Sequence, residues 1–126
     1  MRNTREEYSE VIDEAQALSS VGGNRGLLTE VAGVTLAAWP TLLSDIRKGM
    51  ARGDLPGVKT AARLAQAAAR LVSARWTYEA AHLLETAAGY GDLQATQRAS
   101  ASLEREVWRV QAVLSTLGSF GLPPRG

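Results

Sequence analysis

The chain contains no cysteine and a single histidine, His82, among its 126 residues. Without cysteine it can form neither disulfides nor thiolate sites, and we expect a reducing compartment. One histidine cannot provide a histidine-based zinc site, and we expect no metal and no cofactor. The Walker phosphate loop, the G-x-S-x-G nucleophile motif and the H-E-x-x-H zinc motif are also absent, so the prediction is that the chain is not an enzyme.

Neither sign of charge predominates in the chain. Fourteen basic side chains face 13 acidic ones, for a formal net charge of +1. Non-specific nucleic-acid binding needs a dense excess of Lys and Arg, so no nucleic-acid partner is expected. No apolar run approaches the roughly 20 residues of a transmembrane helix, and the polar, acidic residues 1–14 do not resemble a signal peptide. These features predict a cytoplasmic protein with no membrane partner.

Alternation of β-branched residues is nowhere sustained, whereas apolar residues recur at helical spacings. Asn24 and Asp92 stand where helices would begin, and both are favourable N-caps. Pro40 lies inside the second predicted helix and should kink it, because it removes one backbone hydrogen bond. The helices are expected over residues 4–20 and 24–50, from just after Asp54 to Val72, from just after Ser73 to Gly89, and from Asp92 to Leu117.

Each predicted helix has an inward face of mostly apolar residues. These faces comprise Tyr8, Ile12, Ala15 and Leu18; Leu27, Val31, Val34, Ala38, Leu42 and Ile46; Val58, Ala61, Ala65, Ala68 and Val72; Tyr78, Ala81, Leu84 and Ala88; and Thr96, Ser100, Leu103, Val107, Val110, Leu114 and Leu117. Because short loops join long amphipathic helices, neighbours should run antiparallel. The predicted fold is all-α, an antiparallel four-helix bundle over residues 21–117. A short N-terminal helix in residues 1–20 should cover one end, and residues 118–126 should form a flexible tail that cannot continue a helix.

Several segments in this order and spacing match one family. They are "VGGNRGLLTEV" (21–31), "PTLLSDIRKGMARGD" (40–54), "HLLETAAGYGDL" (82–93) and "LEREVWRVQAVL" (103–114). On these landmarks the chain resembles the histidine-containing phosphotransfer (HPt) domain of multistep two-component signalling, over nearly its full length. The resemblance implies an HPt-like four-helix bundle and a signalling function.

The motif typical of that family, His-x-Leu-Lys-Gly, falls on Arg63, Leu64, Ala65, Gln66 and Ala67. The resemblance therefore puts Arg63 in place of the phosphoacceptor histidine, Gln66 in place of the lysine that neutralises the phosphoryl group, and Ala67 in place of the glycine that admits the partner. Imidazole accepts a phosphoryl group through a nitrogen lone pair, which the protonated guanidinium of arginine lacks. The prediction is a degenerate HPt module that binds a receiver domain or a histidine kinase domain without phosphoryl transfer.

The predicted docking surface consists of Lys59, Arg63, Leu64, Gln66, Ala67 and Arg70. Its cationic members would pair with the acidic residues around the phosphorylatable aspartate of a receiver domain. Other interpretations stay open. In one, the polar residues form an ordinary solvated helix face. Leu64 and Leu71 either widen the core or form, with Ala67, an exposed apolar patch next to Arg63 that docks a receiver domain or makes a homodimer.

His82 lies between Glu79 and Glu85 on a face that should be solvent-facing or at the boundary of the core. It is either an ordinary surface histidine or a substitute phosphoacceptor, in which case the chain would be an active phosphotransfer protein. The three tryptophans, Trp39, Trp76 and Trp108, are expected to anchor the core or its boundary.

Overall fold

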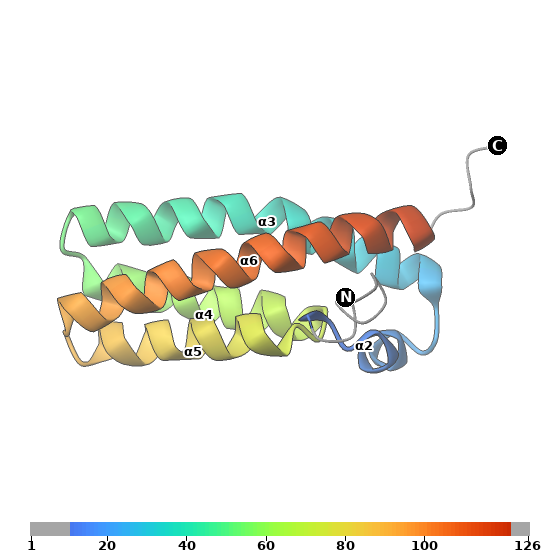
Figure 1. Cartoon of the computed structure of the whole chain (residues 1–126), viewed down its shortest axis with the longest axis horizontal. Coiled ribbons are helices and arrows are strands. Elements are labelled where there is room, and N and C mark those ends of the chain that lie inside the picture. Colours follow the sequence, from blue (N-terminus) through green and yellow to red (C-terminus); the bar gives the residue numbers. More distant parts are fainter. Residues whose placement is uncertain (1–10, 122–126) are drawn as a thin grey trace, which may run out of the picture.

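The structure is a computed structural model that describes residues 11–121, with side chains described for residues 11–113. Four long helices lie side by side and alternate in direction, with a short helix beside one end (Figure 1). In chain order the helices are α2 (Glu14–Ser20), α3 (Arg25–Ala51), α4 (Leu55–Leu71), α5 (Arg75–Gly89) and α6 (Leu93–Gly121). Helices adjacent in the chain pack together from α3 to α6, and α6 closes the bundle against α3. The predicted all-α fold and helical bundle are confirmed.

Polar side chains cap the starts of four of these helices. Asn24 Oδ1 accepts a hydrogen bond from the Leu27 amide at 3.0 Å, and Asp92 Oδ1 accepts one from the Ala95 amide at 3.0 Å, as expected for these two residues. Asp13 and Asp54 cap α2 and α4 in the same way. Helix α5 differs, since its N-cap residue is Ala74, which offers no side-chain acceptor.

The predicted inward faces of α4 and α6 are correct over the described side chains. Val58, Ala61, Ala65, Ala68 and Val72 are buried, and so are Thr96, Ser100, Leu103, Val107 and Val110; the side chains of Leu114 and Leu117 lie outside the described residues. Small residues along α4 bring helix backbones close together. At the α3–α4 crossing, a Cβ placed on Gly49 would lie 2.8 Å from Val58 Cγ2, which no ordinary contact allows.

The predicted inward face of α3 is wrong in the first half of the helix. Leu27 and Val34 are exposed, and the residues one position later in each case, Leu28 and Thr35, are buried. Two rows of apolar residues lie next to each other on this part of α3, and the fold buries the row that contains Trp39. Burial of the Trp39 indole removes far more apolar surface from water than burial of the Val34 side chain would. The two rows meet at Leu42 and Ile46, which are buried as predicted.

The predicted N-terminal helix is interrupted in the part of the chain that the structure describes, because Val11 is helical but Ile12 and Asp13 are not. Helix α2 begins at Glu14, and residues 4–10 of the predicted helix, with Tyr8, lie outside the described residues. Ile12 is buried, but Ala15 is exposed and Ala17 is buried in its place. The break before Glu14 arises where Asp13 caps the new helix and its amide donates to Ser73 O at 3.0 Å.

The C-terminal helix is longer than expected. Helix α6 continues to Gly121, so the prediction that the chain leaves the helix at residue 118 is wrong for residues 118–121. A glycine costs a helix only about 1 kcal/mol relative to alanine, whereas a proline also disfavours the helical conformation of the residue before it. The first proline after the start of α6 is Pro123. Residues 122–126 lie outside the described part.

Helix α3 bears on the expectation that no apolar run approaches the length of a transmembrane helix. By length and composition alone, it is the one helix in residues 11–121 that could cross a membrane, with a mean hydropathy of 1.3 over a window of 18 residues. The core helix of a bundle passes the same test, and α3 packs against both α4 and α6. It continues through Pro40, which is exposed, so the ring points away from the packed face.

Candidate functional site

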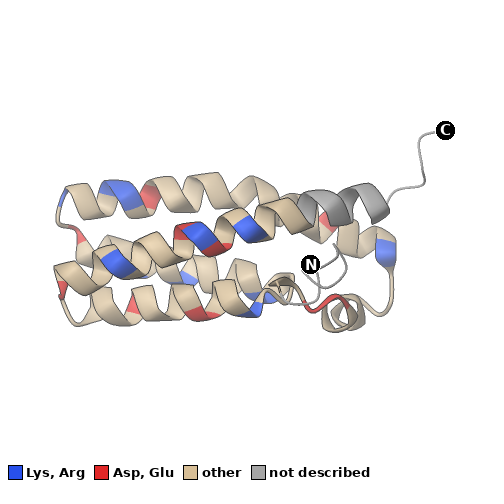
Figure 2. Cartoon of the chain, in the orientation of Figure 1, with Lys and Arg blue, Asp and Glu red and all other residues tan. Residues whose placement is uncertain are grey.

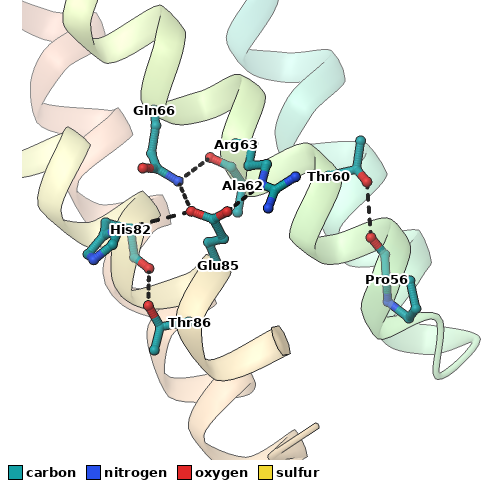
Figure 3. Close-up of polar contacts among 8 residues, drawn as sticks. All are labelled: Pro56, Thr60, Ala62, Arg63, Gln66, His82, Glu85 and Thr86. Atoms are coloured by element: carbon teal, nitrogen blue, oxygen red, sulfur yellow. Dashed lines mark hydrogen bonds and ion pairs between the residues drawn. The ribbon is translucent and has the colours of Figure 1, made fainter. Parts of the chain in front are cut away.

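Glu85 on α5 brings two polar residues of the predicted site, Arg63 and Gln66, to its carboxylate (Figure 3). Arg63 donates from Nε to Glu85 Oε2, and Gln66 donates from Nε2 to Glu85 Oε1 at 2.7 Å. His82 lies on the same helix as Glu85, with its Nδ1 4.0 Å from Glu85 Oε1. Arg63 and Gln66 are one turn apart on α4, so this polar cluster joins α4 to α5.

The surroundings of Glu85 favour its ionised form. Its side chain is only 18% exposed, whereas that of Arg63 is 64% exposed. The hydrogen bond from Gln66 lowers the pKa of Glu85, the hydrogen bond and positive charge of Arg63 lower it further, and partial burial opposes them. The carboxylate is therefore a fixed negative charge that orients two side chains of α4.

The predicted docking residues fall into two groups. Lys59 lies with Arg63 at a shallow hollow of about 360 Å³, where its aliphatic chain passes close to Gly89. Arg70 lies farther along α4 and takes a different partner: its Nη2 donates to Tyr78 Oη at 3.0 Å. The structure therefore brings Lys59, Arg63 and Gln66 to one site and leaves Arg70 at another.

Leu64 and Leu71 are both 55% exposed, so the interpretation that they widen the core is wrong. Ala67 is exposed between them on the same face of α4. The buried face of this helix is occupied by alanines, whose small side chains let the neighbouring helices approach closely. Residues Leu64, Ala67 and Leu71 form what we call the apolar stripe, which borders Arg63.

His82 is 60% exposed on its side chain, which agrees with the expected solvent-facing or boundary position. Of the tryptophans, only Trp39 is an anchor of the core. Trp76 is partly exposed and Trp108 is 74% exposed, so the expectation of a core or boundary position is wrong for Trp108. The tryptophan falls between the buried residues Val107 and Val110 in the chain but on the opposite side of α6.

Glu85 is the site residue that sequence reasoning missed. The sequence placed it beside His82, on the same helix, but not opposite Arg63. The available signal was the turn at residues 72–74, which folds α4 back on α5 and places residues at similar distances from the turn side by side. Arg63 and Glu85 stand 10 and 12 positions from Ser73 in the sequence.

Two of the polar side chains in this cluster lack a nucleophilic group. Arg63 is protonated and paired, and Gln66 has a neutral amide, so neither offers a nucleophile. Within residues 11–121 no group of three or more His, Cys, Asp or Glu side chains could hold a metal ion. Acidic and basic residues are interspersed along the helices (Figure 2).

No protein-family model matches the chain, and neither does any curated protein or any solved structure.

Proposed function

We propose that this protein is a degenerate HPt-like module of phosphorelay signalling, which binds a receiver domain or a histidine kinase domain in the cytoplasm without phosphoryl transfer. The observation that supports it is the state of Arg63. This residue holds the position that the resemblance gives to the phosphoacceptor, and its guanidinium is exposed, paired with Glu85 and adjacent to the apolar stripe.

The charges of the site suit an acidic partner. Lys59 and Arg63 supply two positive charges and Glu85 one negative charge, so the site keeps a net charge of +1 with His82 neutral. Glu85 accepts from Nε of Arg63, so the terminal nitrogens of the guanidinium can donate to acceptors of a partner. A carboxylate of the partner would receive charge-assisted hydrogen bonds there, while Leu64 and Ala67 would supply apolar contact.

Binding to a panel of purified receiver domains and kinase histidine domains tests the proposal. Arg63→Glu reverses the charge at the centre of the surface and should abolish binding to any domain that the wild type binds. Arg105→Glu makes the same charge change on an exposed part of α6 and should leave that binding intact. Binding that survives Arg63→Glu would contradict the proposal.

A second candidate is an active phosphotransfer protein that uses His82. Its support is the exposure of His82 and the carboxylate of Glu85 near its Nδ1, which could orient the imidazole. Incubation with phosphoramidate followed by intact-mass spectrometry separates the two, because transfer to an imidazole nitrogen releases ammonia and adds one phosphoryl group to the protein. The first proposal expects no modification of the wild type and modification of Arg63→His; this candidate expects modification of the wild type that His82→Ala abolishes.

A third candidate is a structural homodimer through the apolar stripe, supported by the exposure of Leu64 and Leu71. The solution mass distinguishes it, since it requires a dimer that Leu64→Ser dissociates.

A further inference from the structure

A cavity of about 570 Å³, wide open to solvent, lies where the turn between α4 and α5 meets α2. Its polar and aromatic lining includes Asp13, Gln16, Arg70, Arg75, Trp76 and Tyr78. Arg70 is seven residues along α4 from Arg63, about 10 Å along the helix axis at 1.5 Å per residue. The cavity is thus separate from the cluster around Glu85, and the inference below does not rest on the proposed function.

Two guanidinium groups are held at this cavity by aromatic side chains. Arg70 donates to Tyr78 Oη, and its guanidinium carbon is 5.1 Å from the centre of the Tyr78 ring. The guanidinium carbon of Arg75 is 5.3 Å from the centre of the Trp76 ring. Contact with the ring faces restrains both cations without neutralising them.

The acidic residues near these cations compensate them only in part. Arg70 has no carboxylate within 4.0 Å among the described residues. Arg75 reaches Glu79 at 3.4 Å, but both side chains are half or more exposed, and such pairs are weak. Asp13 also lines the cavity, with its Oδ1 accepting from the Gln16 amide at the start of α2. The lining therefore contains two positive charges and one negative charge.

The start of α5 adds to this positive potential. Its first turn contains no acidic residue, its N-cap Ala74 accepts no hydrogen bond through a side chain, and its first residue is Arg75. A cation at a helix N-terminus is electrostatically unfavourable, whereas an anion is favourable there. An anion in the cavity would offset both the guanidinium pair and this helix end.

We propose that the cavity binds a small phosphomonoester that carries a flat ring, such as a nucleoside monophosphate. Its phosphate group pairs with Arg70 and Arg75, because planar guanidinium groups donate two parallel hydrogen bonds to phosphate oxygens. The cavity is larger than a phosphate group, and its volume is in the range of sites for small organic ligands. Trp76, Tyr78 and Ala69 provide the apolar wall that a ring would contact.

Calorimetric titration of the full chain with AMP, adenosine and inorganic phosphate tests this proposal. We expect saturable binding of AMP that is at least about tenfold tighter than binding of either fragment. Arg70→Gln should weaken AMP binding by about tenfold or more, since it removes a charge-assisted hydrogen bond. Arg105→Gln, an equal change on exposed α6, should not alter it, and circular dichroism would show that both variants keep the helical fold.

Three results would overturn the proposal. They are the absence of saturable AMP binding, equal binding of AMP and inorganic phosphate (an unspecific anion site), and AMP binding that Arg70→Gln leaves unchanged.

Discussion

The guanidinium of Arg63 on α4 donates through Nε to Glu85 on α5, across the most extensive helix contact of the bundle. The two residues are 22 positions apart in the chain. The carboxylate is much less exposed than the guanidinium, so the acid is part of the helix interface and the base faces the solvent. This pair links the stability of the α4–α5 contact to the surface that we propose for partner binding.

The stability provided by Glu85 should depend on pH. Its pKa in the folded protein lies below the ordinary value of 4.5, first because of the hydrogen bond from Gln66 and second because of Arg63. Folding therefore favours the ionised carboxylate. The stabilisation is fully present above the pKa of the unfolded chain and is lost as the pH falls through the lower, folded-state pKa.

Urea unfolding of the wild type and Glu85→Gln over a pH series checks this expectation. The wild type should be more stable at neutral pH, and the difference should shrink as the pH falls below 4.5. Glu79→Gln removes an exposed pair with Arg75 and should have the smaller effect at neutral pH. A difference that stays constant across the series would show that the charge of Glu85 is unimportant for folding.

Replacement by alanine should destabilise the protein strongly at Trp39 and hardly at Trp108. Trp39 is fully buried on α3, so Trp39→Ala should lower the free energy of unfolding by about 3–5 kcal/mol. Trp108 is largely exposed, and Trp108→Ala should change that free energy by less than about 0.5 kcal/mol. If the two variants lowered the free energy of unfolding equally in a urea titration, the bundle would not bury the row of α3 residues that contains Trp39.

Two glycines of α3 provide a matched test of the α3–α4 packing. A methyl group added at Gly33 would have no neighbour within 4 Å, so Gly33→Ala should stabilise the helix by about 0.5–1 kcal/mol. Gly49→Ala places its methyl 2.8 Å from Val58 Cγ2 and 3.3 Å from Asp54 O. The expected result is a lower midpoint of thermal unfolding for Gly49→Ala and a higher one for Gly33→Ala.

The apolar stripe should contribute little to folding. Leu64→Ser and Leu71→Ser change exposed positions, so each should alter the free energy of unfolding by less than about 0.5 kcal/mol if the chain is monomeric. Urea unfolding at two protein concentrations, with the solution mass measured alongside, checks this. A loss of several kcal/mol that depends on protein concentration would instead favour the homodimer.

Local signals in the sequence were sufficient for most of the secondary structure and for much of the core. Asn24 and Asp92 cap the helices that they were expected to cap, because a capping side chain bonds to an amide only three residues away. The buried faces of α4 and α6 followed from the spacing of their small and apolar residues. The identity of Arg63 alone also excludes a nucleophile there, whatever the fold.

Only the tertiary structure decided between alternatives that are locally equivalent. Helix α3 has two neighbouring rows of apolar residues, and burial of the Trp39 indole against other helices selected one of them. Leu64 and Leu71 suit a core as well as a surface, and the close approach permitted by the alanines of α4 left them outside. The partner of Arg63 was settled by the register of α4 against α5, because side chains 22 residues apart meet only when the two helices pack.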